Sequence, residues 1–197
     1  GLPDLPFLAT TLEEVSALHR LMAPYWDEDL QKFNAMRLLS YPLAPQQVWS
    51  RKVIANLDDL KGLKIRTYSP ELSEMAKILG AAPVSLLAAE VPTALERGTV
   101  DAVITAALNL VPAKWDEQVK YGLLMDMFYT TNMFIVNRSA FGALPPDIQA
   151  IVRDAAKNVE GKYWKFPDEL EGSYMAQVKQ KGITVNRLSD QENKKMR

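Results

Sequence analysis

The residue with the clearest potential for chemistry is Arg66, which stands near the end of a short alternating segment. Leu63, Ile65 and Thr67 alternate with Lys64 and Arg66, the period-two pattern of a strand. Open α/β sheets bind their ligands at the carboxyl ends of such strands. A guanidinium placed there presents a planar fork that matches a carboxylate through two parallel, charge-assisted hydrogen bonds.

A second interpretation of Arg66 is that of an exposed arginine in a surface ion pair. Asp58 and Asp59 precede it in the chain and are the nearest candidate partners. Such a pair contributes little to stability and has no bearing on a ligand. The pattern of residues leaves both interpretations open.

Residues that commonly carry catalysis are scarce. The 197-residue chain has no cysteine, which excludes disulfides, cysteine-based metal sites and thiol catalysis. His19 is the single histidine, and its helix-like surroundings indicate a helix-surface residue. Neither a phosphate-binding loop nor a dinucleotide-binding glycine fingerprint is present. We therefore expect a binding protein with no cofactor, no metal and no enzymatic activity.

The charge balance restricts the partners. Net charge is −1, the calculated isoelectric point is about 6.0, and 48% of residues are hydrophobic. Such a composition offers no basic field for nucleic acid, and no apolar run reaches the roughly 18 residues of a membrane span. The first seven residues lack the features of a signal peptide. We expect no direct membrane insertion, and a chain that is either mature or a segment of something longer.

The elements that must position Arg66 follow in a regular order. A capping box at Thr11 and Glu14 begins a helix that Pro24 is expected either to end or to kink. The prolines at 42 and 45 indicate a crossing between lobes. From residue 56 onward, strands predicted at 63–67, 84–87 and 100–105 alternate with helices. This alternation predicts a mainly parallel sheet with right-handed crossovers.

The second half of the chain predicts one very long helix. Residues 133–136 are a continuous apolar run, which indicates a buried strand. An apolar stripe then continues from Ile148 to Val178 in steps of three and four, with Pro167 expected to bend the helix. A last strand is predicted at 183–188.

Five sequence blocks, taken together, resemble a known family. They are 58–66 (DDLKGLKIR), 79–84 (LGAAPV), 90–101 (EVPTALERGTVD), 115–121 (WDEQVKY) and 144–149 (LPPDIQ). In this order and spacing they are similar to the substrate-binding proteins of tripartite ATP-independent periplasmic (TRAP) transporters, of the dicarboxylate-binding type. The resemblance covers nearly the whole chain.

The resemblance implies a periplasmic-binding-protein-like α/β fold with two lobes, crossing strands and a long C-terminal helix. It implies that 1–44 and 131–197 belong to the first lobe and the connecting helix, and that 45–130 form the second lobe. Crossings are expected near 41–46 and 130–132. The family's opening strands have no counterpart before Gly1, so we expect some ligand contacts to lie outside the sequence.

The resemblance also implies a set of ligand-binding residues. The family's carboxylate-binding arginine corresponds to Arg66, and a frequent ligand-binding asparagine corresponds to Thr105. Some family members have a second arginine at the position of Gln46, and its absence disfavours a dianionic ligand. Ala88 stands where many members have an aromatic residue, which leaves room for a bulkier or differently shaped ligand. Residues from Thr130 to Asn132 complete the expected site.

The function implied is the capture of a small organic acid, in particular a monocarboxylate, in the periplasm, with delivery to TRAP transporter membrane subunits. An alternative is a ligand-sensing domain of the same fold that passes occupancy to a signalling partner, because fold alone does not decide function. An enzyme acting on a small acid is the third interpretation, and the scarcity of catalytic groups weighs against it.

Overall fold

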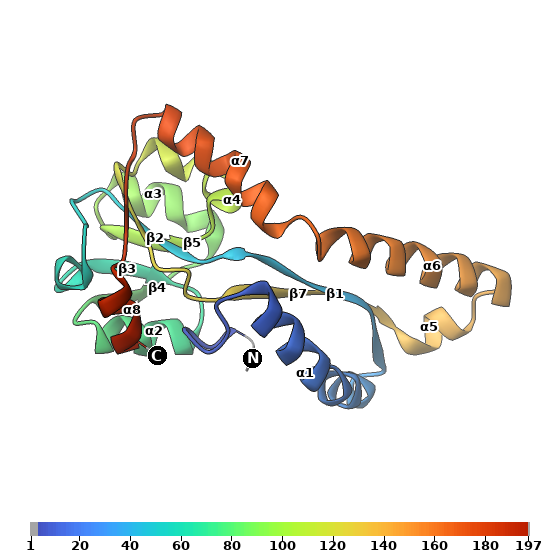
Figure 1. Ribbon diagram of the computed structural model, residues 1–197. Coiled ribbons are helices and arrows are strands. Elements are labelled where there is room, and N and C mark those ends of the chain that lie inside the picture. The colour runs from blue at the N-terminus through green and yellow to red at the C-terminus, as the bar shows by residue number, and fades with distance from the viewer. Residues whose placement is uncertain (1–3, 197) are drawn as a thin grey trace.

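A six-stranded sheet and a separate two-stranded ribbon organise the computed structural model, which describes residues 4–196 (Figure 1). The sheet order is β4 (Ala82–Ser85), β3 (Lys64–Thr67), β5 (Ala102–Thr105), β2 (Gln47–Ser50), β6 (Tyr121–Leu124) and β8 (Thr184–Arg187). β3 pairs in parallel with β4 and β5, and β6 pairs in parallel with β8, whereas β2 runs antiparallel to both of its neighbours. The strands predicted at 63–67, 84–87, 100–105 and 183–188 therefore share one sheet.

Helices cover both faces of this sheet. One face packs against α2 (Pro70–Ile78), α8 (Asp190–Met196) and the short helix η2 (Leu57–Leu60). The other face packs against α3 (Val91–Glu96), α4 (Ala107–Leu110) and α7 (Pro167–Gln180). Successive residues of β5 alternate between the two cores, as strand geometry requires: Ile104 lies in the first and Val103 in the second.

The local sequence signals around β3 act as predicted. The Asn56 side chain accepts hydrogen bonds from the amides of Asp58 and Asp59 and so caps η2. Ser69 caps α2, with Pro70 at its first turn. Gly80 ends that helix in the left-handed region, at a φ of +77° that favours glycine. β4 begins two residues earlier than expected because Ala82 pairs with Lys64 at the start of β3.

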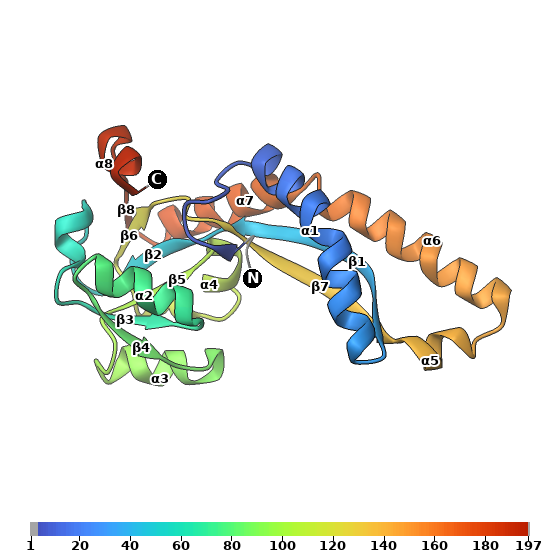
Figure 2. The ribbon, with the colours of Figure 1, turned by 90° about the horizontal axis from the view of Figure 1, so that it is seen from below.

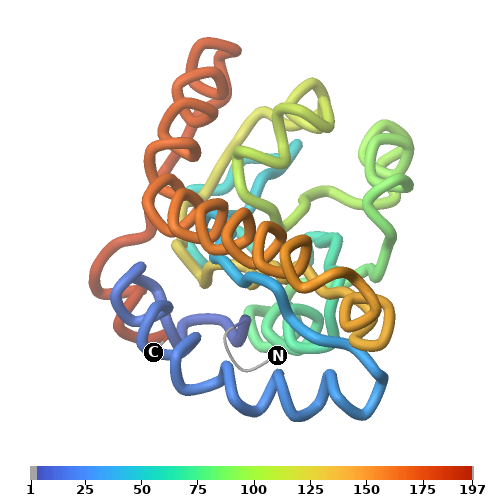
Figure 3. The backbone as a smooth tube through the Cα atoms, turned by 90° about the vertical axis from the view of Figure 1, so that its right-hand side faces the viewer, coloured from blue at the N-terminus to red at the C-terminus, as the bar shows by residue number. Residues whose placement is uncertain are grey.

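The ribbon extends away from the sheet (Figure 2). It consists of β1 (Ala35–Pro45) and β7 (Tyr129–Asn137), paired antiparallel. The helices α1 (Leu12–Lys32) and α6 (Pro146–Tyr163) flank it, and α5 (Arg138–Gly142) lies at its far end (Figure 3). The predicted capping box of Thr11 and Glu14 begins α1, and the helix continues through Pro24. None of the described helices is both long and apolar enough to cross a membrane.

The long C-terminal helix is divided at the predicted proline. α6 ends at Tyr163 and α7 begins at Pro167, which occupies its first turn, where a missing amide hydrogen has no cost. The apolar stripe predicted for this helix is largely exposed along α6: Ile151, for example, lies in solvent. α6 lies mainly against β1 of the ribbon, and Ile148, Ile151 and Val159 remain exposed.

The segment 133–136 is a strand, but the prediction that it is buried is wrong. Phe134 is 57% exposed and Ile135 is 54% exposed. The physical reason is the ribbon's size, because within residues 4–196 β7 pairs with β1 alone. A continuous apolar run indicates a buried strand only where layers cover both of its faces.

The expected lobe boundaries also need a correction. β8 pairs with β6 in the six-stranded sheet, and Val178 of α7 lies in the core of that sheet. The chain therefore returns to the sheet after residue 166, which differs from the expected assignment of all of 131–197 to the first lobe and connecting helix. Residues 1–3 and 197, included in that assignment, lie outside the described residues.

His19 is buried, which corrects its assignment to a helix surface. It is 4% exposed, and its Nε2 lies 3.0 Å from the Thr131 hydroxyl oxygen. The rings of Trp26 and Trp164 contact it edge-on, at centroid distances of 5.2 and 5.0 Å. Trp164 follows α6, so burial of His19 depends on a contact across 145 positions that no local pattern reveals.

Candidate functional site

All six of the residues predicted for the site line one cavity of about 610 Å³ at an edge of the sheet. They are Gln46, Arg66, Ala88, Thr105, Thr130 and Asn132. The remaining lining residues are Leu43, Tyr68, Leu108, Asn109, Pro112, Ala113 and Trp115. The structure thus brings together positions that are separated by up to 86 residues in the sequence.

Strand direction explains why these residues meet. β3 and β5 are parallel and end at the same edge, which places Arg66 and Thr105 near each other. β2 is antiparallel, so it begins at the edge where β5 ends, and its residue Gln47 pairs with Thr105. Gln46 immediately precedes that pair, and its backbone N–H donates to the Phe128 carbonyl at 2.9 Å. The crossing strand β7 then supplies Thr130 and Asn132.

Arg66 is a buried cation held in a fixed position. Its side chain is mostly covered, with the residue 5% exposed, and its Nε donates to the Leu86 carbonyl at 3.1 Å. The guanidinium carbon lies 5.0 Å from the ring centroid of Tyr68 and 5.6 Å from that of Trp115. These rings contribute cation–π attraction and leave the outer nitrogens of the guanidinium for other partners.

The described residues do not neutralise the charge of Arg66. No carboxylate of residues 4–196 lies within ion-pair distance of its guanidinium. Burial lowers the pKa of Arg66 from its usual value, and an arginine nevertheless remains protonated at neutral pH. A buried charge without a partner is costly, so this geometry favours an anion in the cavity.

The surface ion pair considered from the sequence is therefore wrong. Asp58 pairs instead with Lys61, at 2.7 Å. Asp59 accepts hydrogen bonds from the amides of Ala55 and Asn56, at 2.7 and 3.3 Å. Both aspartates therefore stabilise the turn before β3, and neither pairs with Arg66 in that strand.

The neutral polar residues of the cavity are held by their own contacts. The Thr105 carbonyl accepts a hydrogen bond from the Trp49 indole at 2.9 Å, which fixes the end of β5. Trp49 reaches that position because Gly122 faces it: a Cβ there would lie 2.7 Å from the indole ring. The Asn132 side chain donates to the Thr130 carbonyl at 3.4 Å. Ala88 begins the short helix η3 (Ala88–Glu90) and adds no bulk.

Sequence reasoning missed Tyr68 and Trp115 as members of the site. A signal for Tyr68 was present, because it stands two positions after Arg66 along an extended segment, where alternate side chains share a face. Trp115 follows a left-handed residue, Lys114, at the start of η4 (Trp115–Glu117). Nothing in the local pattern placed its ring beside Arg66.

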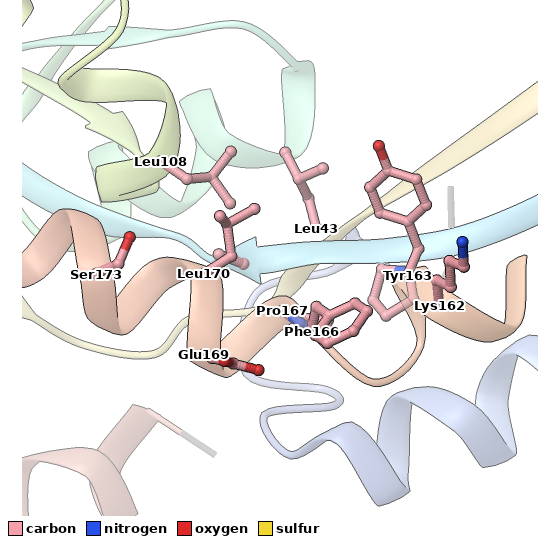
Figure 4. Close-up of a pocket in the computed structure, with 11 residues that line it drawn as sticks. Leu43, Leu108, Lys162, Tyr163, Phe166, Pro167, Glu169, Leu170 and Ser173 are labelled. Atoms are coloured by element: carbon pink, nitrogen blue, oxygen red, sulfur yellow. The ribbon is translucent and has the colours of Figure 1, made fainter. Parts of the chain in front are cut away.

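An apolar pocket of about 550 Å³ adjoins this cavity, and Leu43 and Leu108 line both. Its other apolar walls come from the break between α6 and α7, in particular from Tyr163, Phe166 and Leu170 (Figure 4). The lining of this pocket is mainly apolar, although Lys162, Glu169 and Ser173 also reach it, whereas amide and hydroxyl side chains surround Arg66 in the other cavity. The Arg66 cavity is thus the candidate site for a polar ligand.

The arrangement can bind an anion. Among the described residues that line the cavity, Arg66 is the only charged one. No paired carboxylates or histidine line it that could transfer protons, and no group of three or more acidic or histidine residues within 4–196 is placed to hold a metal. What the described residues provide is one cation, hydrogen-bonding amides and hydroxyls, and two aromatic rings.

Comparisons with known proteins agree with this geometry. A solute-binding protein of Verminephrobacter eiseniae is 31% identical over 187 residues, covering 92% of this chain and 55% of that protein. The 2,3-diketo-L-gulonate-binding periplasmic protein of Escherichia coli is 28% identical over 195 residues, covering 94% of this chain and 57% of that protein. The chain thus spans little more than half the length of these relatives.

A solved structure has the same fold. An extracytoplasmic solute receptor of Bordetella pertussis that binds pyroglutamic acid superposes with a TM-score of 0.92, at 29% identity, covering 99% of this chain and 65% of that one. The predicted periplasmic-binding-protein-like α/β fold is thereby confirmed. The family model for bacterial extracellular solute-binding proteins, family 7, matches residues 1–197. The chain belongs to this family of extracellular solute-binding proteins.

Proposed function

We propose that this chain captures a small organic acid with one carboxylate outside the cytoplasm and delivers it to the membrane subunits of a TRAP-type transporter. The observation that carries the proposal is the buried, unpaired guanidinium of Arg66 in a cavity of polar groups. A carboxylate bound to its outer nitrogens would supply the missing negative charge. No chemical step follows binding, and no cofactor takes part.

A single carboxylate fits the cavity better than two. Gln46 stands where a second arginine would provide a second positive charge, and it is neutral. Thr105, Thr130 and Asn132 offer hydrogen bonds without charge, and Ala88 leaves space beside them. A second carboxylate in this cavity would be desolvated without a counter-charge, which is unfavourable.

The relatives support this class of ligand. The Bordetella pertussis receptor binds pyroglutamic acid, and the Escherichia coli protein binds 2,3-diketo-L-gulonate. Each of these acids has one carboxylate. The chain spans 65% of the first protein and 57% of the second, so their ligands indicate the class of acid that we propose and not its identity. Their names describe solute binding outside the cytoplasm, which is the first step of the proposed function.

A thermal-shift screen of the 197-residue chain against organic acids tests this function. An acid present at about 100 times its dissociation constant should stabilise the chain by about 2.7 kcal/mol, several degrees in Tm. The same acid should have almost no effect on Arg66→Ala. The proposal fails if no acid raises the Tm, or if an acid raises the Tm of both proteins equally.

A further inference from the structure

A directional chain of hydrogen bonds joins two side chains of the cavity to a backbone carbonyl. The Tyr68 hydroxyl lies 3.3 Å from Gln46 Oε1, and Gln46 Nε2 lies 3.2 Å from the Ala44 carbonyl oxygen. Thr130, on the crossing strand β7, lines the same cavity. Tyr68 is therefore the first member of a chain that leads through Gln46 to the backbone of β1.

The direction of this chain is fixed by its last member. A carbonyl oxygen only accepts, so the nitrogen of the Gln46 amide must face Ala44. Its oxygen then faces Tyr68, so the phenol must donate to it. Burial raises the pKa of Tyr68, which keeps this phenol protonated as a donor at neutral pH.

One hydrogen of Gln46 Nε2 remains after the contact with Ala44. Gln46 is nearly inaccessible to bulk solvent and lines the Arg66 cavity, so a ligand is the natural acceptor for that hydrogen. Had the amide been turned over, it would have offered an oxygen to the ligand instead. The Tyr68 hydroxyl thus helps decide whether the cavity presents a donor or an acceptor at this position.

We propose that Tyr68 is a positioning residue that makes the cavity selective for acids carrying a neutral oxygen acceptor, such as a carbonyl, near their carboxylate. The inference rests on the proposed function, since it assumes that Arg66 binds the carboxylate of the same ligand. Tyr68 contacts Arg66 and Gln46 through different atoms. Its ring contacts the Arg66 guanidinium, and its hydroxyl orients the Gln46 side-chain amide.

This separation makes Tyr68→Phe an informative variant. Phenylalanine keeps the ring beside Arg66 and removes only the hydroxyl, so binding of the carboxylate should be retained. The Gln46 amide loses its donor and becomes free to rotate. Selectivity for the acceptor should fall while affinity for a plain carboxylate stays the same, a result that general damage to the fold would not produce.

The experiment compares two probes by calorimetric titration. Pyroglutamate has a ring carbonyl, and cyclopentanecarboxylate has a ring of the same size without an acceptor. Wild type should bind pyroglutamate at least about tenfold more tightly than cyclopentanecarboxylate. Tyr68→Phe should reduce this ratio of affinities by about tenfold, which corresponds to one neutral hydrogen bond. Tyr25→Phe, at an exposed tyrosine of α1, is the matched control and should leave both affinities unchanged.

The outcomes separate this inference from the proposed function. An unchanged ratio in Tyr68→Phe, or an equal loss of affinity for both acids, overturns the role of Tyr68. If Arg66→Ala binds each acid as tightly as wild type does, the carboxylate site itself is overturned instead. In the ligand-free chain, NMR relaxation of the Gln46 side-chain amide should show greater mobility in Tyr68→Phe, and equal mobility would also overturn the inference.

Discussion

β5 and β7 are two apolar strands with opposite surroundings. All four residues of β5 are buried, because helices cover both faces of the six-stranded sheet. β7 belongs to a ribbon of two strands, and two of its large apolar side chains are more than half exposed. Burial is thus decided by the layers around a strand and not by its own composition.

The same difference divides the candidate site. Arg66, Thr105 and Gln46 lie at the edge of the covered sheet, where backbone pairing and two cores fix them. Thr130 and Asn132 come from the ribbon and are half-buried. The sheet supplies the charged group that we propose for the carboxylate, and the ribbon supplies neutral contacts from the opposite side.

The largest expected difference in stability is between Ile104 of β5 and Ile135 of β7. Ile104 is fully buried, so Ile104→Ala should lower the free energy of unfolding by about 2–5 kcal/mol through lost burial and the resulting cavity. Ile135→Ala removes the same atoms from a half-exposed position and should cost less than about 1 kcal/mol. Urea unfolding of both variants measures the two values, and equal losses would contradict the comparison.

His19 should make the contact between α1 and α6 sensitive to acid. Burial, and to a lesser extent the charge of Arg37, lower the pKa of His19 to about 4 despite the opposing effect of Asp4. An unfolded histidine takes up a proton near pH 6.5, so acidification between these values favours the unfolded state. The stability present above pH 6.5 should decline by up to about 3 kcal/mol as the pH falls toward 4.

Unfolding of wild type and His19→Gln at pH 7.5 and 5 measures this effect. His19 is the only histidine of the chain, so the difference between the two pH profiles isolates its contribution from that of the carboxylates. The variant should be less stable at pH 7.5 and should lose less on acidification. Parallel profiles would show that His19 titrates normally and is not buried as described.

The elements around Arg66 were predictable because their signals are local. Asn56, Ser69 and Gly80 mark helix ends within a few residues, and strand alternation placed Arg66 near a sheet edge. The burial of His19 and the exposure of Phe134 were not predictable, because each depends on partners distant in the sequence. The ring of Trp115 beside Arg66 depends on tertiary packing in the same way.

Glu171 and Glu160 attach the two halves of the long helix, α7 and α6, to the sheet and to the ribbon respectively. Glu171 of α7 is 6% exposed, and its carboxylate accepts from the amides of Ala107 and Leu108 at 2.8 and 2.9 Å, at the start of α4. Glu160 of α6 is half-buried and accepts one hydrogen bond, from the Ser40 amide at 2.8 Å in the ribbon. The helix is therefore attached more firmly to the sheet than to the ribbon.

Glu171→Gln should cost about 1–2 kcal/mol, since glutamine has one side-chain oxygen and leaves one of the two amides at the start of α4 without its acceptor. Glu160→Gln should cost about half as much or less, because it affects one bond at a half-buried position. Thermal unfolding of the two variants gives the ranking. A larger loss for Glu160→Gln would mean that the ribbon, and not the sheet, holds the long helix.

The smallest effect on stability is expected from Ile135→Lys. A lysine on the exposed face of β7 should change the free energy of unfolding by no more than about 0.5 kcal/mol. The exposed strand should nevertheless favour self-association of the chain, which a charge on that strand suppresses. Sedimentation velocity should show less association in the variant than in wild type, and a monomeric wild type would contradict this prediction.

Calorimetric titration of wild type, Arg66→Lys and Arg66→Ala with one organic acid tests the central claim most directly. Removing one partner of a buried charge pair typically costs about 2–5 kcal/mol, so Arg66→Ala should bind roughly thirty- to several-thousand-fold more weakly. Arg66→Lys keeps the charge without the planar fork and should lie between the two. Arg97→Ala, at an exposed arginine, should bind like wild type. Equal affinity of wild type and Arg66→Ala would contradict the assignment of Arg66 to the carboxylate.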